Sequence, residues 1–158
     1  MKQRLWWLLL PLGVAGLDLG SKALLVSSLH YGEIRTVIPG FFNLTYTLNT
    51  GAIFGTFQGA PAWLRLTLFT AAGLLALAYF GREFLRAETP RIQRIALGGI
   101  LGGALGNGTD RLVRHAVVDF LDFHYAGWHY WTFNLADSAI VCGAIVLGWS
   151  LLTRREPA

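Results

Sequence analysis

Charged residues are scarce in this 158-residue chain: Asp, Glu, Lys and Arg make up 14% of it, against about 25% in a typical soluble domain. Hydrophobic residues make up 54%, and the mean hydropathy is +0.48. This imbalance argues against an ordinary water-soluble domain and predicts that lipid surrounds much of the chain. The net charge is +4, but no block of basic residues interleaved with aromatics occurs, so no nucleic-acid partner is predicted.

Cysteine is also scarce, and no paired histidine motif occurs. Cys142 is the only cysteine, which excludes an intrachain disulfide and a cysteine-based metal cluster. The four histidines fall outside the apolar stretches, and no His-Glu-x-x-His segment occurs. The sequence therefore predicts neither a metal nor a cofactor, and it assigns the histidines to surface or structural roles.

Long apolar runs are abundant by contrast. Four of them cover about residues 5–29, 61–80, 95–113 and 133–152. Each meets the length of about 20 residues that a spanning helix needs. The first run continues too far for a cleaved signal peptide, so it is predicted to be a retained helix. We therefore expect a mainly α membrane protein with four transmembrane helices in one domain over residues 1–158.

The basic residues predict an orientation. Eight of them precede the first run, follow the fourth, or lie between the second and third. Four lie on the other side, at positions 35, 65, 111 and 114. Because Lys and Arg are enriched on the cytoplasmic side, both termini are predicted to be cytoplasmic. Residues 30–60 and 114–132 then face outward.

Two patterns predict local structure around these runs. Apolar and polar residues alternate strictly over residues 42–49, just after Pro39-Gly40, and this period of two is typical of a half-buried strand. A small extracytoplasmic β-sheet at about residues 33–50 is therefore expected. In the third run, Gly98, Gly102 and Gly106 recur every four residues, a spacing that permits close approach between helices.

Two carboxylates are the leading candidates for chemistry. Asp119 follows the third run and Asp137 lies near the start of the fourth, so both are expected at the same membrane face among apolar neighbours. Two buried carboxyl groups that share a proton can hydrolyse a peptide: the ionised one takes a proton from water, and the other protonates the substrate. The alternative is that each Asp is a helix cap or an ion-pair partner.

Other polar residues accompany them. Asn107, Asp110, Arg111 and Arg114 share one helical face. They form either the polar wall of a substrate cleft or a capping network of Asp110 with Arg114 and Asn107 with Arg111. Asp18 and Lys22 are four residues apart inside the first run. They form either an intrahelical ion pair or a pair that orients the site.

Five segments, taken in chain order, resemble the conserved boxes of bacterial lipoprotein signal peptidase (signal peptidase II), an aspartyl membrane peptidase. They are DLGSK at 18–22, YTLNTGA at 46–52, GGALGN at 102–107 with Asp110-Arg111, VVDF at 117–120, and FNLADS at 133–138. Each segment alone is only moderately specific. Five in order, on four predicted spans, are highly specific.

The resemblance implies an aspartic endopeptidase of the bacterial inner membrane. Its substrate would be a diacylglyceryl-modified prolipoprotein, cleaved just before the lipidated cysteine. The fold would be four transmembrane helices, an extracytoplasmic β-cradle, and a short amphipathic helix near residues 51–58. Membrane lipids are the other expected partner, with no metal or nucleic acid, and a monomer is expected. Ile53 stands where the family usually has a small residue, which is expected to alter the gating loop.

The resemblance also assigns site residues. The catalytic pair would be Asp119 and Asp137. Residues that bind substrate or hold the aspartates would be Asn49, Gly51, Asn107, Arg111 and Asn134. Asp18, Lys22 and Asp110 are expected to orient the site.

Three other functions are compatible with parts of the pattern. A proton-coupled transporter would use Asp18, Lys22 and Asp137 as a relay. A non-enzymatic membrane scaffold would rest on the Gly-rich helix. A serine–lysine peptidase would use Ser21 with Lys22, although neighbours on a helix point about 100° apart.

Overall fold

The computed structural model describes residues 5–51, 59 and 61–153. The helices are η1 (Trp6–Leu8), α2 (Leu9–Ser28), α3 (Ala62–Leu85), α4 (Arg91–Arg114) and α5 (Leu135–Leu152), and the strands are β1 (Ile34–Ile38), β2 (Phe42–Asn49), β3 (Val117–Tyr125) and β4 (Trp128–His129). The amphipathic helix predicted near residues 51–58 falls, apart from Gly51, outside the described residues, as does Ile53.

Three helices are long and apolar enough to cross a membrane among the residues described: Trp6–Ser28, Trp63–Leu85 and Leu135–Leu152. Their outer surfaces carry exposed Leu, Ile and Trp side chains, such as Leu75 and Ile145. Helix α4 has 24 residues, about 36 Å at the usual rise. Its glycines and terminal charges make it less apolar, so a count of four spans stays a prediction.

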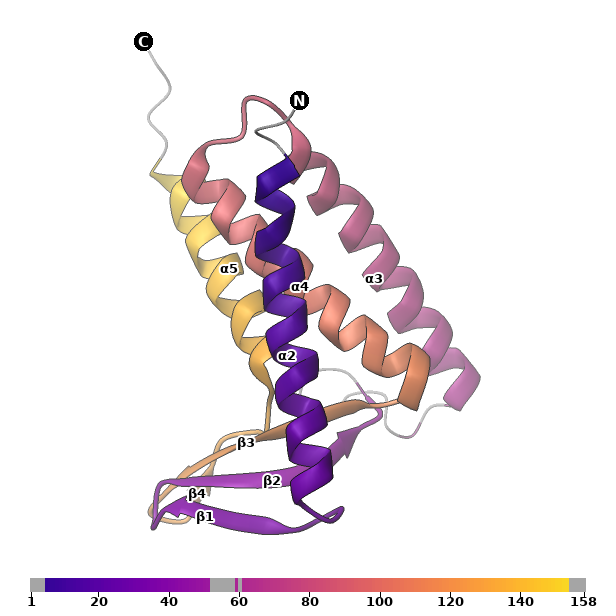
Figure 1. The fold of residues 1–158 in the computed structure, drawn as a ribbon, viewed down its shortest axis with the longest axis vertical. Helices are drawn as coiled ribbons and strands as arrows, with labels where there is room; N and C mark the ends of the chain where they lie inside the picture. The colour runs from indigo at the N-terminus through magenta and orange to yellow at the C-terminus, as the bar shows by residue number, and fades with distance from the viewer. Residues whose placement is uncertain (1–4, 52–58, 60, 154–158) are drawn as a thin grey trace.

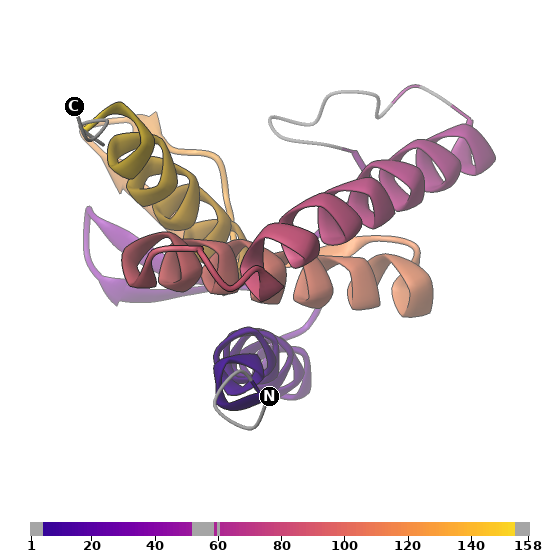
Figure 2. The same cartoon turned by 90° about the horizontal axis from the view of Figure 1, so that it is seen from above.

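Helix α4 lies between the other helices and packs against α2, α3 and α5 (Figure 2). Its glycines make this possible. A Cβ on Gly102 would lie 2.7 Å from the Pro11 carbonyl oxygen of α2, and a Cβ on Gly103 would overlap the Ala136 carbonyl of α5. The two neighbouring helices therefore approach α4 at backbone distance, as the small-residue spacing predicts.

The sheet lies across one end of the helices (Figure 1). It is antiparallel in the order β1-β2-β3-β4. The expectation of strand at about 33–50 accounts for β1 and β2. Strands β3 and β4 arise in the region 114–132, which had been assigned only an outward-facing position. A cluster of Leu25, Leu29, Val118 and Phe120 packs β3 against the end of α2.

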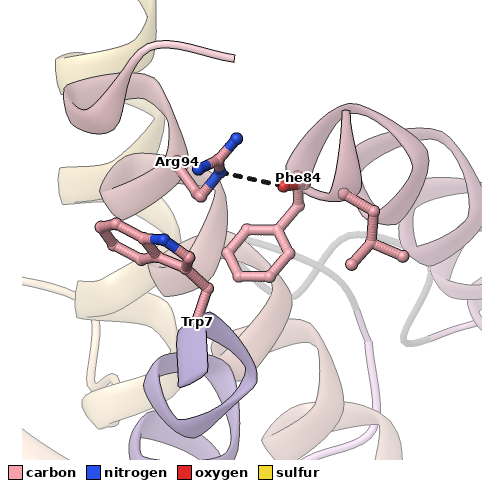
Figure 3. Close-up of a pocket in the computed structure, with 4 residues that line it drawn as sticks. Trp7, Phe84 and Arg94 are labelled. Carbon is pink, nitrogen blue, oxygen red and sulfur yellow. Dashed lines mark hydrogen bonds between the residues drawn. The ribbon is translucent and has the colours of Figure 1, made fainter. Parts of the chain in front are cut away.

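The opposite end of the molecule is held by Arg94. Its Nε donates to the Phe84 carbonyl at 3.2 Å, and its guanidinium lies over the Trp7 ring, 5.5 Å from the centroid (Figure 3). Carbonyls at a helix C-terminus have no partner within the helix, so Arg94 caps α3. The start of α2, the α3–α4 connection and the end of α5 all lie at this end, away from the sheet (Figure 1).

Candidate active site

Asp119 and Asp137 reach the same place from different elements. Helix α4 ends at Arg114, and the left-handed backbone of the next residue, His115 (φ 59°), turns the chain into β3, where Asp119 is the third residue. Asp137 lies in the first turn of α5. Strand β3 and the start of α5 meet at the junction of the sheet and the helices (Figure 1). The two carboxylates therefore lie at one end of the molecule, among buried neighbours.

Asn134 bonds to both carboxyl groups. Its side-chain Nδ2 donates to Asp119 Oδ1 at 2.7 Å, and its backbone N–H donates to Asp137 Oδ2 at 3.3 Å. The Asn134 side chain also accepts from the Asp137 N–H at 2.9 Å, which completes a capping box at the start of α5. Asp137 is thus a helix-capping residue, and the cap itself ties it to Asp119.

Burial dominates the electrostatics of Asp119. Its side chain is almost completely enclosed. Loss of water, followed by the nearby Asp137 charge, raises the pKa of Asp119 to about 6, while hydrogen bonds from Asn49 and Asn134 act in the lowering direction. A carboxyl group with a pKa in this range can hold or release a proton near neutral pH, as general acid–base chemistry requires.

A second set of predicted residues reaches Asp119 from β2. Asn49 donates through Nδ2 to Asp119 Oδ2 at 3.0 Å, and its Oδ1 accepts from the Gly51 N–H at 3.0 Å. Arg111 then donates to the Gly51 carbonyl at 2.9 Å and lies over the Phe69 ring. Asn49 therefore fixes the far side of the Asp119 carboxylate, and Gly51 and Arg111 hold Asn49 in place.

Asn107 connects Asp137 to a buried cation. Its Nδ2 donates to Asp137 Oδ1 at 2.8 Å, while its Oδ1 accepts from Lys22 Nζ at 2.9 Å. The ammonium group can only donate, so it fixes which way the Asn107 amide points. The pairing of Asn107 with Arg111, one of the interpretations of the helical face, is replaced by these two bonds.

The cation is held by two carboxylates that also bond the segments carrying Asp119 and Asp137. Lys22 Nζ lies 2.7 Å from Asp18 and 3.0 Å from Asp110, and all three side chains are fully buried. Asp18 accepts from the Ala136 N–H at 2.9 Å, and Asp110 accepts from the Val118 N–H at 3.1 Å. Ala136 and Val118 each immediately precede one of the two aspartates.

The local pairs expected among the polar helix residues form in part. Asp18 and Lys22 form the intrahelical pair, and Asp110 pairs with Arg114. The same residues also reach across to β3 and α5. Ser21 donates to the Asp18 carbonyl at 2.8 Å, an ordinary helical back-bond that does not favour a serine–lysine pair.

A cavity of about 270 Å³ opens beside Arg111, between α3 and α4. Its walls are Thr50, Trp63, Arg65, Leu66, Phe69, Arg111 and His115. Of these, only Arg111 had been singled out from the sequence. The others were missed because an aromatic or arginine in an apolar run carries no signal of the partner it will face.

Sequence reasoning missed two other features. Thr47 donates to the Asp119 carbonyl at 3.1 Å, and the strand alternation, with Thr47 two residues before Asn49, was the available signal. Asp122, His124 and His129 come together on the sheet, although the histidines had been set aside as unpaired. Their proximity depends on a hairpin that sequence reasoning did not predict.

Comparison with known proteins places this site in a family. Residues 10–153 match the family described as signal peptidase (SPase) II. The chain belongs to this family. A lipoprotein signal peptidase from Burkholderia mallei (strain SAVP1) is 43% identical over 148 residues, which is 94% of this chain and 88% of the relative. The lipoprotein signal peptidase of Burkholderia vietnamiensis (strain G4 / LMG 22486) gives the same values.

Solved structures of bacterial membrane enzymes share the fold of this chain. A bacterial membrane enzyme solved by the in meso method at 2.3 Å superposes with a TM-score of 0.83 at 27% identity, covering 96% of this chain and 93% of the other. A second such structure, at 1.9 Å, gives a TM-score of 0.81 at 29% identity and covers 94% of each chain. The helices and the sheet of this signal peptidase II member thus follow a fold already seen in bacterial membrane enzymes.

Proposed function

We propose that this protein removes the signal peptide from diacylglyceryl-modified prolipoproteins, cutting the bond just before the lipidated cysteine, with Asp119 and Asp137 as the catalytic pair. The observation that carries the proposal is the double role of Asn134, which donates to Asp119 at 2.7 Å and to Asp137 at 3.3 Å. One residue that bonds both carboxyl groups supports their action as a unit.

In the proposed reaction, water lies between the two carboxyl groups. The ionised Asp137 removes a proton from water, and the water oxygen bonds to the carbonyl carbon of the scissile amide. Asp119 gives its proton to the carbonyl oxygen, which produces a neutral tetrahedral intermediate. The C–N bond then breaks as the amine takes a proton from Asp137, and the diol returns one to Asp119. Asp119 is assigned the starting proton because burial raises its pKa to about 6.

The buried cluster of Asp18, Lys22 and Asp110 is assigned a positioning role. It bonds the backbone N–H groups that precede Asp119 and Asp137 and reaches Asp137 through Asn107. Arg111 and Gly51 hold Asn49 against Asp119 in the same way. We propose that rigid support of this kind holds the two carboxyl groups at the separation that proton transfer through one water needs.

The substrate is proposed to enter along the helices. A lipid-anchored peptide presents its scissile bond near the membrane surface. Asp119 of β3 and Asp137 in the first turn of α5 belong to elements that meet where the helices reach the sheet (Figure 1). The cavity beside Arg111, with Trp63 and Phe69 in its walls, offers an apolar surface next to Asn49 and Gly51. We assign it to the part of the substrate nearest the cleavage point.

We further propose that residues 1–158 act as one membrane-embedded domain with four spans, with α4 as a spanning helix in addition to α2, α3 and α5. The termini would be cytoplasmic, and the sheet and the dyad would lie at the extracytoplasmic face. Support for α4 as a span comes from its length and from its place between three helices that are long and apolar enough to cross a membrane (Figure 2). Because α4 packs against its neighbours at backbone distance, it does not need a strongly apolar surface of its own to lie in the membrane.

The test is a gel-shift assay on a purified diacylglyceryl-modified precursor, with wild type, Asp119→Asn and Asp137→Asn. Each single change should lower the cleavage rate by at least about 100-fold, the usual contribution of a general acid or base. Glu33→Gln is the matched control, because Glu33 is a carboxylate at the edge of the sheet whose contacts are with the His30 N–H and the exposed Arg35. It should cleave at the wild-type rate.

Folding is checked on the same samples by thermal unfolding in detergent. The two Asn variants should retain a cooperative transition, so that the loss of rate reports chemistry. Near-normal turnover by either Asn variant would disprove the catalytic pair.

A further inference from the structure

Three metal-ligating side chains meet on the sheet, away from the aspartate pair. Asp122 and His124 are two residues apart on β3, so their side chains lie on one face of the strand. His129 of β4 is the direct cross-strand partner of His124. Residues at i, i+2 and the cross-strand partner of i+2 point the same way, so the hairpin itself converges the three groups.

The donor atoms are close enough to share one ion. One ligand atom from each residue lies within 4.8 Å of the other two. His129 Nδ1 is 3.3 Å from Asp122 Oδ1, and His124 Nδ1 is 3.9 Å from Asp122 Oδ2. Donors at about 2.0–2.2 Å from a metal lie roughly 3–4 Å apart. A shift of less than about 1 Å would bring the three donor atoms to these distances. The His129 side chain is 62% exposed and has room for such a shift.

A neighbouring residue already orients the carboxylate. Asn43 Nδ2 donates to Asp122 Oδ2 at 2.8 Å, a contact that is buried between β2 and β3. Asp122 Oδ1 is thereby left facing His129. A hydrogen bond that fixes a ligating carboxylate is a regular feature of metal centres and raises their affinity. The imidazole rings of His124 and His129 stack at 5.1 Å, which keeps both beside the same carboxylate.

The site is separate from the catalytic pair. Asp119 is an odd-numbered residue of β3, whereas Asp122 and His124 are even-numbered, so they project from the opposite face of the strand. Val118 and Phe120 flank Asp119 in the sequence and lie on the even face, where they pack against the end of α2. A metal at the outer part of this face would therefore not reach the proposed water.

We propose that Asp122, His124 and His129 bind a divalent transition-metal ion, with zinc as the best fit. Two imidazoles and one carboxylate suit zinc, and three protein ligands leave a fourth position for water. The bound ion links β3 to the short strand β4, whose only residues are Trp128 and His129. Its expected effect is to stabilise this edge of the sheet. The proposal does not depend on the proposed peptidase activity.

The experiment is equilibrium dialysis of the full chain against Zn²⁺ in detergent, with an affinity tag that contains no histidine. Wild type should bind one Zn²⁺ per chain. His129→Ala and Asp122→Asn should each weaken binding by at least about tenfold. His30→Ala, which removes an exposed imidazole elsewhere, and Asp119→Asn should bind as wild type does.

A second readout separates a built site from loss of fold. Added Zn²⁺ should raise the Tm of wild type, because an ion that binds only the folded chain stabilises it. The rise should be absent in His129→Ala while its Tm without metal stays near that of wild type. No binding by wild type, or equal binding by wild type and the His129 and Asp122 variants, would overturn the proposal.

Discussion

Asn134 is the residue that connects Asp119 with Asp137. Its amide nitrogen, its amide oxygen and its backbone N–H each form a bond to one of the two aspartates. The Asn134 side chain is fully buried, so water cannot replace these bonds. Replacing the side chain with alanine would remove the donor to Asp119 Oδ1 and leave the Asp137 N–H without its acceptor, at a cost of about 1–3 kcal/mol for each unsatisfied group.

The raised pKa of Asp119 predicts a pH dependence. The proposed reaction needs a pair that carries one proton, and Asp119 holds that proton below its pKa of about 6. As the pH rises through this value the proton is lost, so kcat/KM should fall by about tenfold per pH unit well above it. Initial rates on the lipidated precursor between pH 5 and 8 measure this falling limb of the pH profile of kcat/KM. A flat profile across this range would contradict the assignment of the proton to Asp119.

Asn49 supplies the control for this profile. Its hydrogen bond to Asp119 favours the ionised form and so lowers the pKa. Removing the bond in Asn49→Ala should raise the pKa of Asp119 and move the falling limb to higher pH. A merely structural role for Asn49 would lower the rate at every pH without moving the limb.

At the scale of elements, α4 organises the molecule. It contacts the three other long helices through a glycine-rich stretch, and its last turns carry Asn107, Asp110 and Arg111 to the site. The same helix therefore sets both the packing distance and the position of the polar side chains. Gly106 illustrates the coupling, because a Cβ there would overlap the Asp18 carboxylate.

A pair of glycine substitutions tests this coupling. In Gly103→Ala the new methyl group would overlap the Ala136 carbonyl, which is backbone and cannot rotate away. Helix α5 must then shift, at a cost of about 1–3 kcal/mol, and Asp137 shifts with it. We expect a lower Tm in detergent and slower precursor cleavage.

Gly108→Ala is the matched control within the same helix. A Cβ at Gly108 meets nothing within 4 Å, and alanine favours a helix over glycine by about 1 kcal/mol. Its Tm should be unchanged or higher, with wild-type cleavage. Equal Tm and rate for both variants would show that the approach of α4 to α5 does not position Asp137.

At the scale of the whole molecule, the sheet lies at one end of the helices and Arg94 with its capped helix at the other (Figures 1 and 3). Exposed Leu and Ile side chains, such as Leu75 and Ile145, cover the helices between these ends. Such a surface is typical of contact with lipid. Under the proposed function, Asp119 and Asp137 would lie near one membrane surface, where a lipid-anchored substrate and water could both reach them.

The proposed orientation is testable by cysteine labelling. Replacement of Cys142 by Ser removes the only native thiol. Single cysteines at Tyr125, in the exposed end of β3, and at Glu88, in the α3–α4 connection, then report each end. A membrane-impermeant maleimide should label position 125 in intact spheroplasts and position 88 only after lysis. The reverse pattern would overturn the orientation.

The sequence alone determined the features that depend on local spacing. Apolar runs located the long helices to within a few residues, because helix length and composition respond directly to lipid. Strict alternation over 42–49 located β2. The carboxylates were singled out because a charge in an apolar segment is costly wherever the chain folds.

Only the tertiary structure decided which groups meet. Lys22 is paired with Asp18 through local spacing, but its contacts with Asp110 and Asn107 cross between helices. Strand β3 and the meeting of His124 with His129 depend on strand pairing and register. Spacing along a chain fixes neighbours within one element, whereas bonds between elements depend on how closely glycines let helices approach and on which strands pair.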